Sequence, residues 1–129
     1  MMHPYELIGM KYRLGATPEK HGAADCLSLS IAVLTFYGIS TPEPERGWYR
    51  RLRKGDTDVF RDELSKWGIK IDSPTLGAVA LCRSETGSST GLAMATFFED
   101  GWISFVGPTA MWNPIGALAV EELYSCRLK

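Results

Sequence analysis

The chain has 129 residues, of which 45% are hydrophobic and 22% are charged, a composition typical of globular proteins. A chain of this length can bury a core without disulfides or metals, so we expect a single domain spanning residues 1–129. The formal net charge of −1 argues against nucleic acid or an anionic membrane surface as a partner.

The cysteine pattern and the N-terminal residues indicate where the protein resides. Its three cysteines are odd in number and irregularly spaced, which favours reduced thiols over a disulfide framework or a zinc site. The N-terminal residues lack the basic and apolar regions of a secretion signal, and no apolar stretch is long enough to span a bilayer. We therefore expect a cytoplasmic protein, or one packed into a particle assembled there, without a metal or cofactor.

The first part of the chain is predicted to be mainly helical. Residues 4–10 are expected to form a short helix, and residues 11–20 a loop. Residues 26–37 are apolar around almost the whole helix axis, which is typical of a helix buried on most sides, and Gly38 ends it.

Two further helices are predicted before the strands begin. Residues 45–54 have helical spacing of Trp48, Tyr49 and Leu52, although Gly47 and Gly55 weaken the prediction of a helix. Residues 59–67 carry one apolar stripe, follow an aspartate-rich cap and stop at a glycine.

The rest of the chain is rich in strand-forming residues. Strands are predicted at residues 77–82, 92–98 and 102–106, with Glu99-Asp100-Gly101 as a hairpin turn. A structured loop is expected at residues 108–116, followed by a closing strand within 118–128. The predicted fold class is α+β, with helices packed against an antiparallel sheet.

Cys26 is the main candidate for chemistry. It lies at the start of the apolar helix, where the positive end of the helix dipole favours the thiolate, the nucleophilic form of cysteine. A cysteine nucleophile also needs a base, and the chain has only His3 and His21. The alternative is a buried structural thiol, since free cysteine is among the most buried residue types.

A family resemblance begins at these residues. Residues 8–15 (IGMKYRLG) and 25–29 (DCLSL) resemble the N-terminal half of the NlpC-type papain-like cell-wall peptidases, where Gly-x-x-Tyr-x-x-Gly-Gly precedes Asp-Cys-Ser-Gly-Leu-Val. The order of elements matches along the whole chain, whereas Leu27-Ser28 and Gly15-Ala16 depart from the family pattern. The resemblance implies a papain-like fold with Cys26 at the nucleophile position and Tyr12 lining the cleft.

The second half of the match lacks the catalytic partners. Residues 93–101 align with the family hairpin His-Val-Gly-Ile-Tyr-Leu-Gly-Asp-Gly, so that Ala93 occupies the base position and Phe105 the third, orienting position. A shift of two residues places Gly91 at the base position instead. Neither register supplies an imidazole, and general acid–base assistance is worth about 10²–10⁴-fold.

Other candidate residues have simpler interpretations. His21 could approach Cys26 as a substitute base, but a histidine in a polar loop more often faces solvent. Asp25 is better explained as a helix N-cap than as a catalytic acid. Tyr12 could line a cleft or simply pack in the core.

The basic run at residues 46–54, with its interleaved Trp48 and Tyr49, would suit phosphate or single-stranded nucleic acid. Because acidic residues flank the run, a solvated helix face with salt bridges is favoured.

Two functional classes follow from the resemblance. The first is a catalytically impaired NlpC-like domain that acts as a binding or assembly module, as for family-like proteins in phage tails and baseplates; it implies a tail or assembly protein as partner and a virion location. The second is an active thiol amidase or endopeptidase that cleaves cell-wall peptides with Cys26, with His21 or a partner chain supplying the base. A small intracellular amidase of another substrate class is a third.

Overall fold

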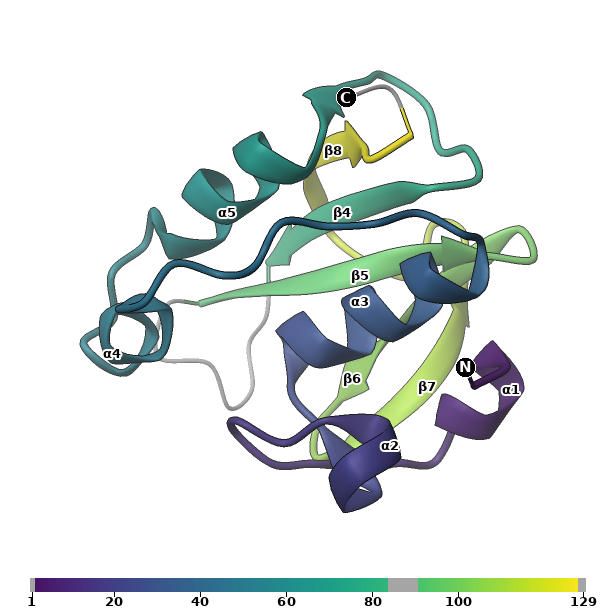
Figure 1. The fold of residues 1–129 in the computed structure, drawn as a ribbon. Coiled ribbons are helices and arrows are strands. Elements are labelled where there is room, and N and C mark those ends of the chain that lie inside the picture. The colour runs from purple at the N-terminus through teal and green to yellow at the C-terminus, as the bar shows by residue number, and fades with distance from the viewer. Residues whose placement is uncertain (1, 84–90, 128–129) are drawn as a thin grey trace.

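The computed structural model describes residues 2–83 and 91–127. Within these residues, five helices pack against a curled sheet of eight strands, a mixed α+β architecture (Figure 1). The helices are α1 (Pro4–Leu7), α2 (Pro18–His21), α3 (Cys26–Phe36), α4 (Trp48–Arg53) and α5 (Val59–Trp67). The strands are β1 (Lys11–Tyr12), β2 (Ala23–Ala24), β3 (Ile69–Lys70), β4 (Ala78–Arg83), β5 (Leu92–Phe98), β6 (Gly101–Val106), β7 (Thr109–Pro114) and β8 (Val120–Ser125).

The sheet has the strand order β2-β1-β7-β6-β5-β4-β8-β3. Its neighbouring strands are antiparallel except for β1 and β2, which run parallel. The predicted antiparallel sheet is therefore correct for its central and C-terminal strands. The parallel edge pair forms because the segment through α2 returns the chain to the side of β1, directly before α3 begins.

The predicted helices at residues 26–37 and 59–67 are confirmed as α3 and α5. Gly38 adopts a positive φ of 76°, which a glycine accommodates without strain, and α3 ends just before it. The expected helices at residues 4–10 and 45–54 are shorter, because Gly9 (φ 90°) and Gly47 lie inside those ranges.

Two predicted loops were wrong. The expected loop at residues 108–116 contains the strand β7. Pro114 is the last residue of this strand, so its missing N–H interrupts no hydrogen bond in the middle of the strand. The expected loop at residues 11–20 contains β1 and most of the one-turn helix α2, which begins with Pro18. The closing strand is β8; Leu128 of its predicted range lies outside the described residues.

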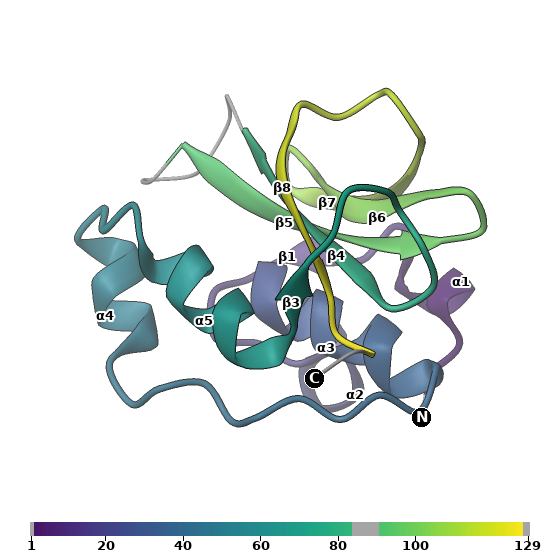
Figure 2. The same ribbon diagram turned by 90° about the horizontal axis from the view of Figure 1, so that it is seen from above.

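The hydrophobic core lies on both faces of the sheet. Figure 2 shows α3, α4 and α5 on one side, where α3 crosses β5 and β6. The largest cluster fills the space between these helices and the sheet, and includes Trp48, Phe60, Leu64, Trp67 and Met94. A smaller cluster around Trp102 packs on the opposite face, beneath the loop that joins β7 to β8.

The hairpin between β5 and β6 turns at Glu99 and Asp100, as predicted. Both residues have positive φ, 49° and 57°, while Phe98 pairs with Gly101, the geometry of a two-residue type I′ turn. We expect Asp100→Gly to raise the free energy of unfolding by about 0.5 kcal/mol, because glycine adopts this backbone without a side-chain penalty. Denaturant melts would measure it, and no gain over wild type would contradict this account of the turn.

Candidate functional site

The start of α3 is held by the buried side chain of Asp25, which is only 1% exposed. Its Oδ1 accepts a hydrogen bond from the Ser28 N–H at 2.9 Å, and its Oδ2 accepts one from the Gly15 N–H at 2.8 Å. In return, the Asp25 N–H donates to Ser28 Oγ at 3.0 Å, which completes a capping box. The predicted N-cap is confirmed. Both carboxylate oxygens accept hydrogen bonds from backbone N–H groups, which fits a structural role rather than proton transfer.

Cys26 is the first residue of α3, and its side chain packs against the largest core cluster. Burial raises the pKa of its thiol to about 11, while a hydrogen bond from the Met94 N–H opposes this shift and the Asp25 charge adds to it. Desolvation therefore outweighs the helix dipole, which was expected to favour the thiolate. At neutral pH the group is a thiol.

The face of β5 that contacts α3 is identified by a buried hydrogen bond from Thr96 Oγ1 to Ser30 Oγ at 2.8 Å. Because side chains alternate along a strand, Met94 and Leu92 lie on this same face. Both residues belong to the cluster against which Cys26 packs. The two side chains of β5 nearest the start of α3 are therefore apolar.

Ala93, at the aligned base position, lies on the other face of the sheet. It pairs with Cys82 of β4, and Cys82 packs with Ala95 and Trp102 on the face away from α3. Gly91 precedes the strand and has no side chain to offer. The residues of β5 that face α3 are therefore the neighbours of Ala93 in the sequence, and not Ala93 itself. Neither Ala93, Gly91 nor the residues that face α3 carry an imidazole.

Tyr12 and Phe105 contact each other. Their rings are in edge contact with centroids 5.1 Å apart, so the cleft position and the third aligned position are neighbours. Burial raises the pKa of Tyr12 to about 12, and negative charge at Cys26 and then Asp25 adds to the shift. Tyr12 nevertheless remains 38% exposed, which leaves part of its ring on the surface.

Tyr49 of α4 is a member of this site that the sequence analysis placed in the basic run but did not associate with Cys26. Burial raises its pKa, followed by contributions from the Asp25 carboxylate and from Tyr12. The structure therefore brings Tyr49, Asp25, Tyr12 and Cys26 together from three segments of the chain. The helical spacing of residues 45–54 gave Tyr49 a core-facing position, but no local signal named its neighbours.

Neither histidine is engaged with the thiol. His21 is exposed in α2, where its Nδ1 accepts a hydrogen bond from the Thr17 N–H at 3.0 Å. His3 caps α1 by accepting from the Tyr5 N–H at 3.2 Å, and its ring packs on Phe36. Both imidazoles thus have local partners, and neither is among the groups that shift the pKa of Cys26.

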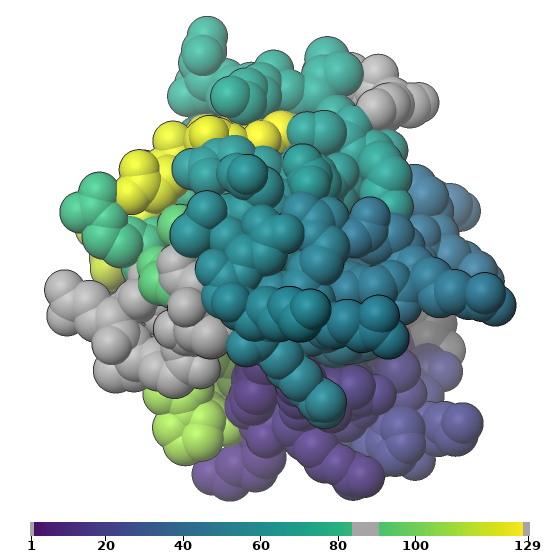
Figure 3. Space-filling view, turned by 90° about the vertical axis from the view of Figure 1, so that its left-hand side faces the viewer, coloured from purple at the N-terminus to yellow at the C-terminus, as the bar shows by residue number. Residues whose placement is uncertain are grey.

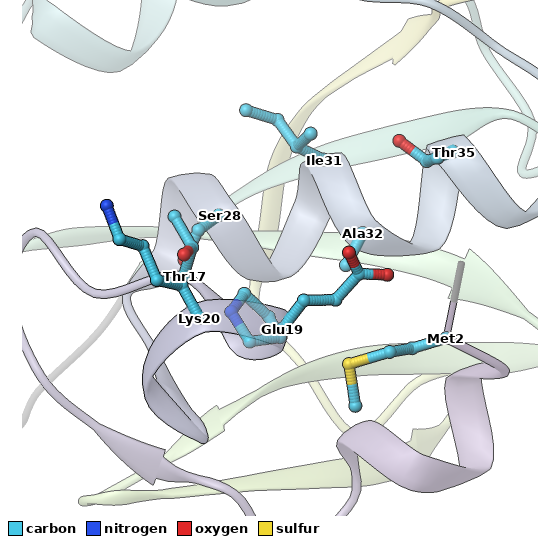
Figure 4. Close-up of a pocket in the computed structure, with 9 residues that line it drawn as sticks. Met2, Thr17, Glu19, Lys20, Ser28, Ile31, Ala32 and Thr35 are labelled. Atoms are coloured by element: carbon cyan, nitrogen blue, oxygen red, sulfur yellow. The ribbon is translucent and has the colours of Figure 1, made fainter.

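A separate pocket of about 340 Å³ opens between α2, α3 and the N-terminal segment (Figure 4). Met2, Pro18, Ile31 and Ala32 give it a largely apolar wall. Cys26 does not line it. Across residues 2–83 and 91–127, we find no group of three or more histidine, cysteine or acidic side chains placed to bind a metal ion. Over the same residues, every helix is too short or too polar to cross a membrane.

Fold and site together define a mixed α+β protein in which a partly buried cysteine begins the central helix and packs against apolar side chains of the sheet. Comparisons of the chain with models of protein families, with curated proteins and with solved structures found no match.

Proposed function

We propose that this chain is a catalytically impaired NlpC-like domain that acts as a binding or assembly module, in a setting such as a phage tail or baseplate. The family motif residues support the NlpC-like assignment. Asp25 caps, and Cys26 begins, the helix that packs on the β5–β6 hairpin. Tyr12, whose pKa is influenced by Cys26, contacts Phe105. A tail or assembly protein is the partner that this proposal implies.

One observation carries the loss of catalysis. The Cys26 thiol faces Leu92 and Met94 rather than a base, and burial keeps it protonated at neutral pH. A thiol hydrolase needs a group to take the proton from sulfur and to return it to the leaving amine. Because neither His3 nor His21 is placed for this, the geometry favours binding over cleavage.

Incubation of the purified protein with peptidoglycan should release no soluble fragments, and Cys26→Ser should be indistinguishable from wild type in this assay. Fragments would be measured by chromatography and mass spectrometry against a buffer blank. Turnover that disappears in Cys26→Ser would overturn the proposal and support the active amidase. If turnover disappeared also in folded His21→Ala, that histidine would be its base.

The assembly role has its own test. The tagged protein, expressed in the cell that encodes it, should co-purify with a larger particle or with one of its structural proteins. Size-exclusion chromatography and mass spectrometry of the captured material would identify that protein. A lone monomer in every fraction would contradict the assembly role while leaving the absence of turnover unaffected.

A further inference from the structure

Helix α4 and the residues beside it carry several cations without a carboxylate partner among the residues that the structure describes. Those that make no ion pair in the described part of the chain, and are exposed, are Arg46, Arg50, Arg53 and Lys54. Among residues 2–83 and 91–127, the remaining cation of the run, Arg51, is the one that has carboxylate partners. Within the described part of the chain, the predicted salt-bridged helix face is therefore confirmed for Arg51.

Arg51 forms ion pairs with three of the acidic residues around α4. Its guanidinium contacts Glu45 at 2.8 Å, Asp56 at 2.7 Å and Asp62 at 2.6 Å, which ties α4 to the segments before and after it. These contacts lower the pKa of Asp56 below its usual value, as expected for a carboxylate paired with arginine. Because these three carboxylates are paired with Arg51, they do not neutralise the other cations of the run.

This positive surface borders the Cys26 site. Tyr49 approaches Asp25 and Tyr12, and Arg53, four residues after Tyr49, lies on the same side of α4. Arg46 lies in the turn directly before the helix. The exposed Arg13 follows Tyr12 directly. In Figure 3, the blue-green surface around α4 lies directly against the purple N-terminal segment. The cations therefore form a rim around one edge of the site.

We propose that this basic rim, defined as Arg13, Arg46, Arg50, Arg53 and Lys54, binds an acidic segment of the partner protein. The inference rests on the proposed binding function and specifies the chemistry of the partner. The planar guanidinium group of arginine can donate two parallel hydrogen bonds to one carboxylate. Several neighbouring arginines therefore suit closely spaced Asp and Glu side chains. The partly exposed ring of Tyr12 adds an apolar contact beside the charges.

An acidic peptide fits the rim better than nucleic acid does. A helix of six residues is only about 9 Å long, so it can contact a few neighbouring carboxylates but no extended track of phosphates. The whole chain has a formal net charge of −1, so nothing beyond the rim draws a long polyanion to the surface. Local positive charge on a neutral protein is the pattern that a short acidic segment complements.

The test is binding of a fluorescein-labelled, glutamate-rich peptide, followed by fluorescence anisotropy at low and at physiological salt. Charge reversal of the rim in Arg50→Glu/Arg53→Glu should weaken binding about fivefold. The matched control, Lys20→Glu/Lys70→Glu, changes net charge equally at exposed sites away from the rim and should bind like wild type. Circular dichroism would establish that both double variants are folded.

Equal binding by the two double variants would overturn the rim as the site. Tighter binding of a single-stranded oligonucleotide than of the peptide, lost in the same rim variant, would assign the surface to nucleic acid instead. Failure of the wild-type protein to bind the peptide would overturn the acidic-segment proposal, whereas co-purification with a particle would still support the assembly role.

Discussion

Asp25→Ala is expected to lower the free energy of unfolding by about 3 kcal/mol. The substitution removes the acceptor for the Ser28 N–H, a helix cap worth about 1 kcal/mol, and the acceptor for the Gly15 N–H. A buried donor left without a partner costs about 1–3 kcal/mol more. Chemical denaturation followed by circular dichroism would measure the loss.

Asp58 provides the matched control for this experiment. It is also an N-cap aspartate, preceding α5, but it is exposed and its side chain makes no cap hydrogen bond. Asp58→Ala should therefore change the free energy of unfolding by less than about 0.5 kcal/mol. If the two alanine variants lost equal stability, the special contribution of the Asp25 hydrogen bonds would be refuted.

The elements predicted well from the sequence are those with a long periodic pattern and a definite end. The nine-residue helix α5 has an apolar stripe and ends before a glycine, and β5 is a run of strand-forming residues that ends at a turn. By contrast, β1, β2 and β3 have two residues each. So short a segment shows no periodicity, and only the neighbouring strand makes it part of a sheet.

The parts of the site that depend on neighbouring residues in the sequence could be predicted. The parts that depend on which face of the sheet a side chain occupies could not. A polar residue before an apolar helix is sufficient to predict the cap at Asp25. Which side chain of β5 faces Cys26 depends on the pleat, and a shift of one residue exchanges the two faces. Ala93 was therefore aligned at the base position, although Met94 and Leu92 are the residues that face α3.

Alkylation of Cys26 by iodoacetamide at pH 7 is expected to be at least about tenfold slower in the folded protein than in the unfolded chain. Raising the thiol pKa from 9.0 to about 11 lowers the thiolate fraction about 100-fold. The greater nucleophilicity of a more basic thiolate offsets about tenfold of this, and packing of the sulfur slows the reaction further. Mass spectrometry of the Cys26 peptide would follow the reaction without interference from Cys82 or Cys126.

The pH dependence separates ionisation from simple shielding of the sulfur. Below its pKa, a thiol reacts in proportion to its thiolate fraction, so the rate in the folded protein should rise about tenfold per pH unit and keep rising beyond pH 9. A rate that levels off between pH 6 and 7 would show a thiolate stabilised by a partner, as in an active cysteine hydrolase. That result would contradict the proposed loss of catalysis, because a low thiol pKa needs a group that stabilises the thiolate, and the apolar side chains of Leu92 and Met94 do not supply one.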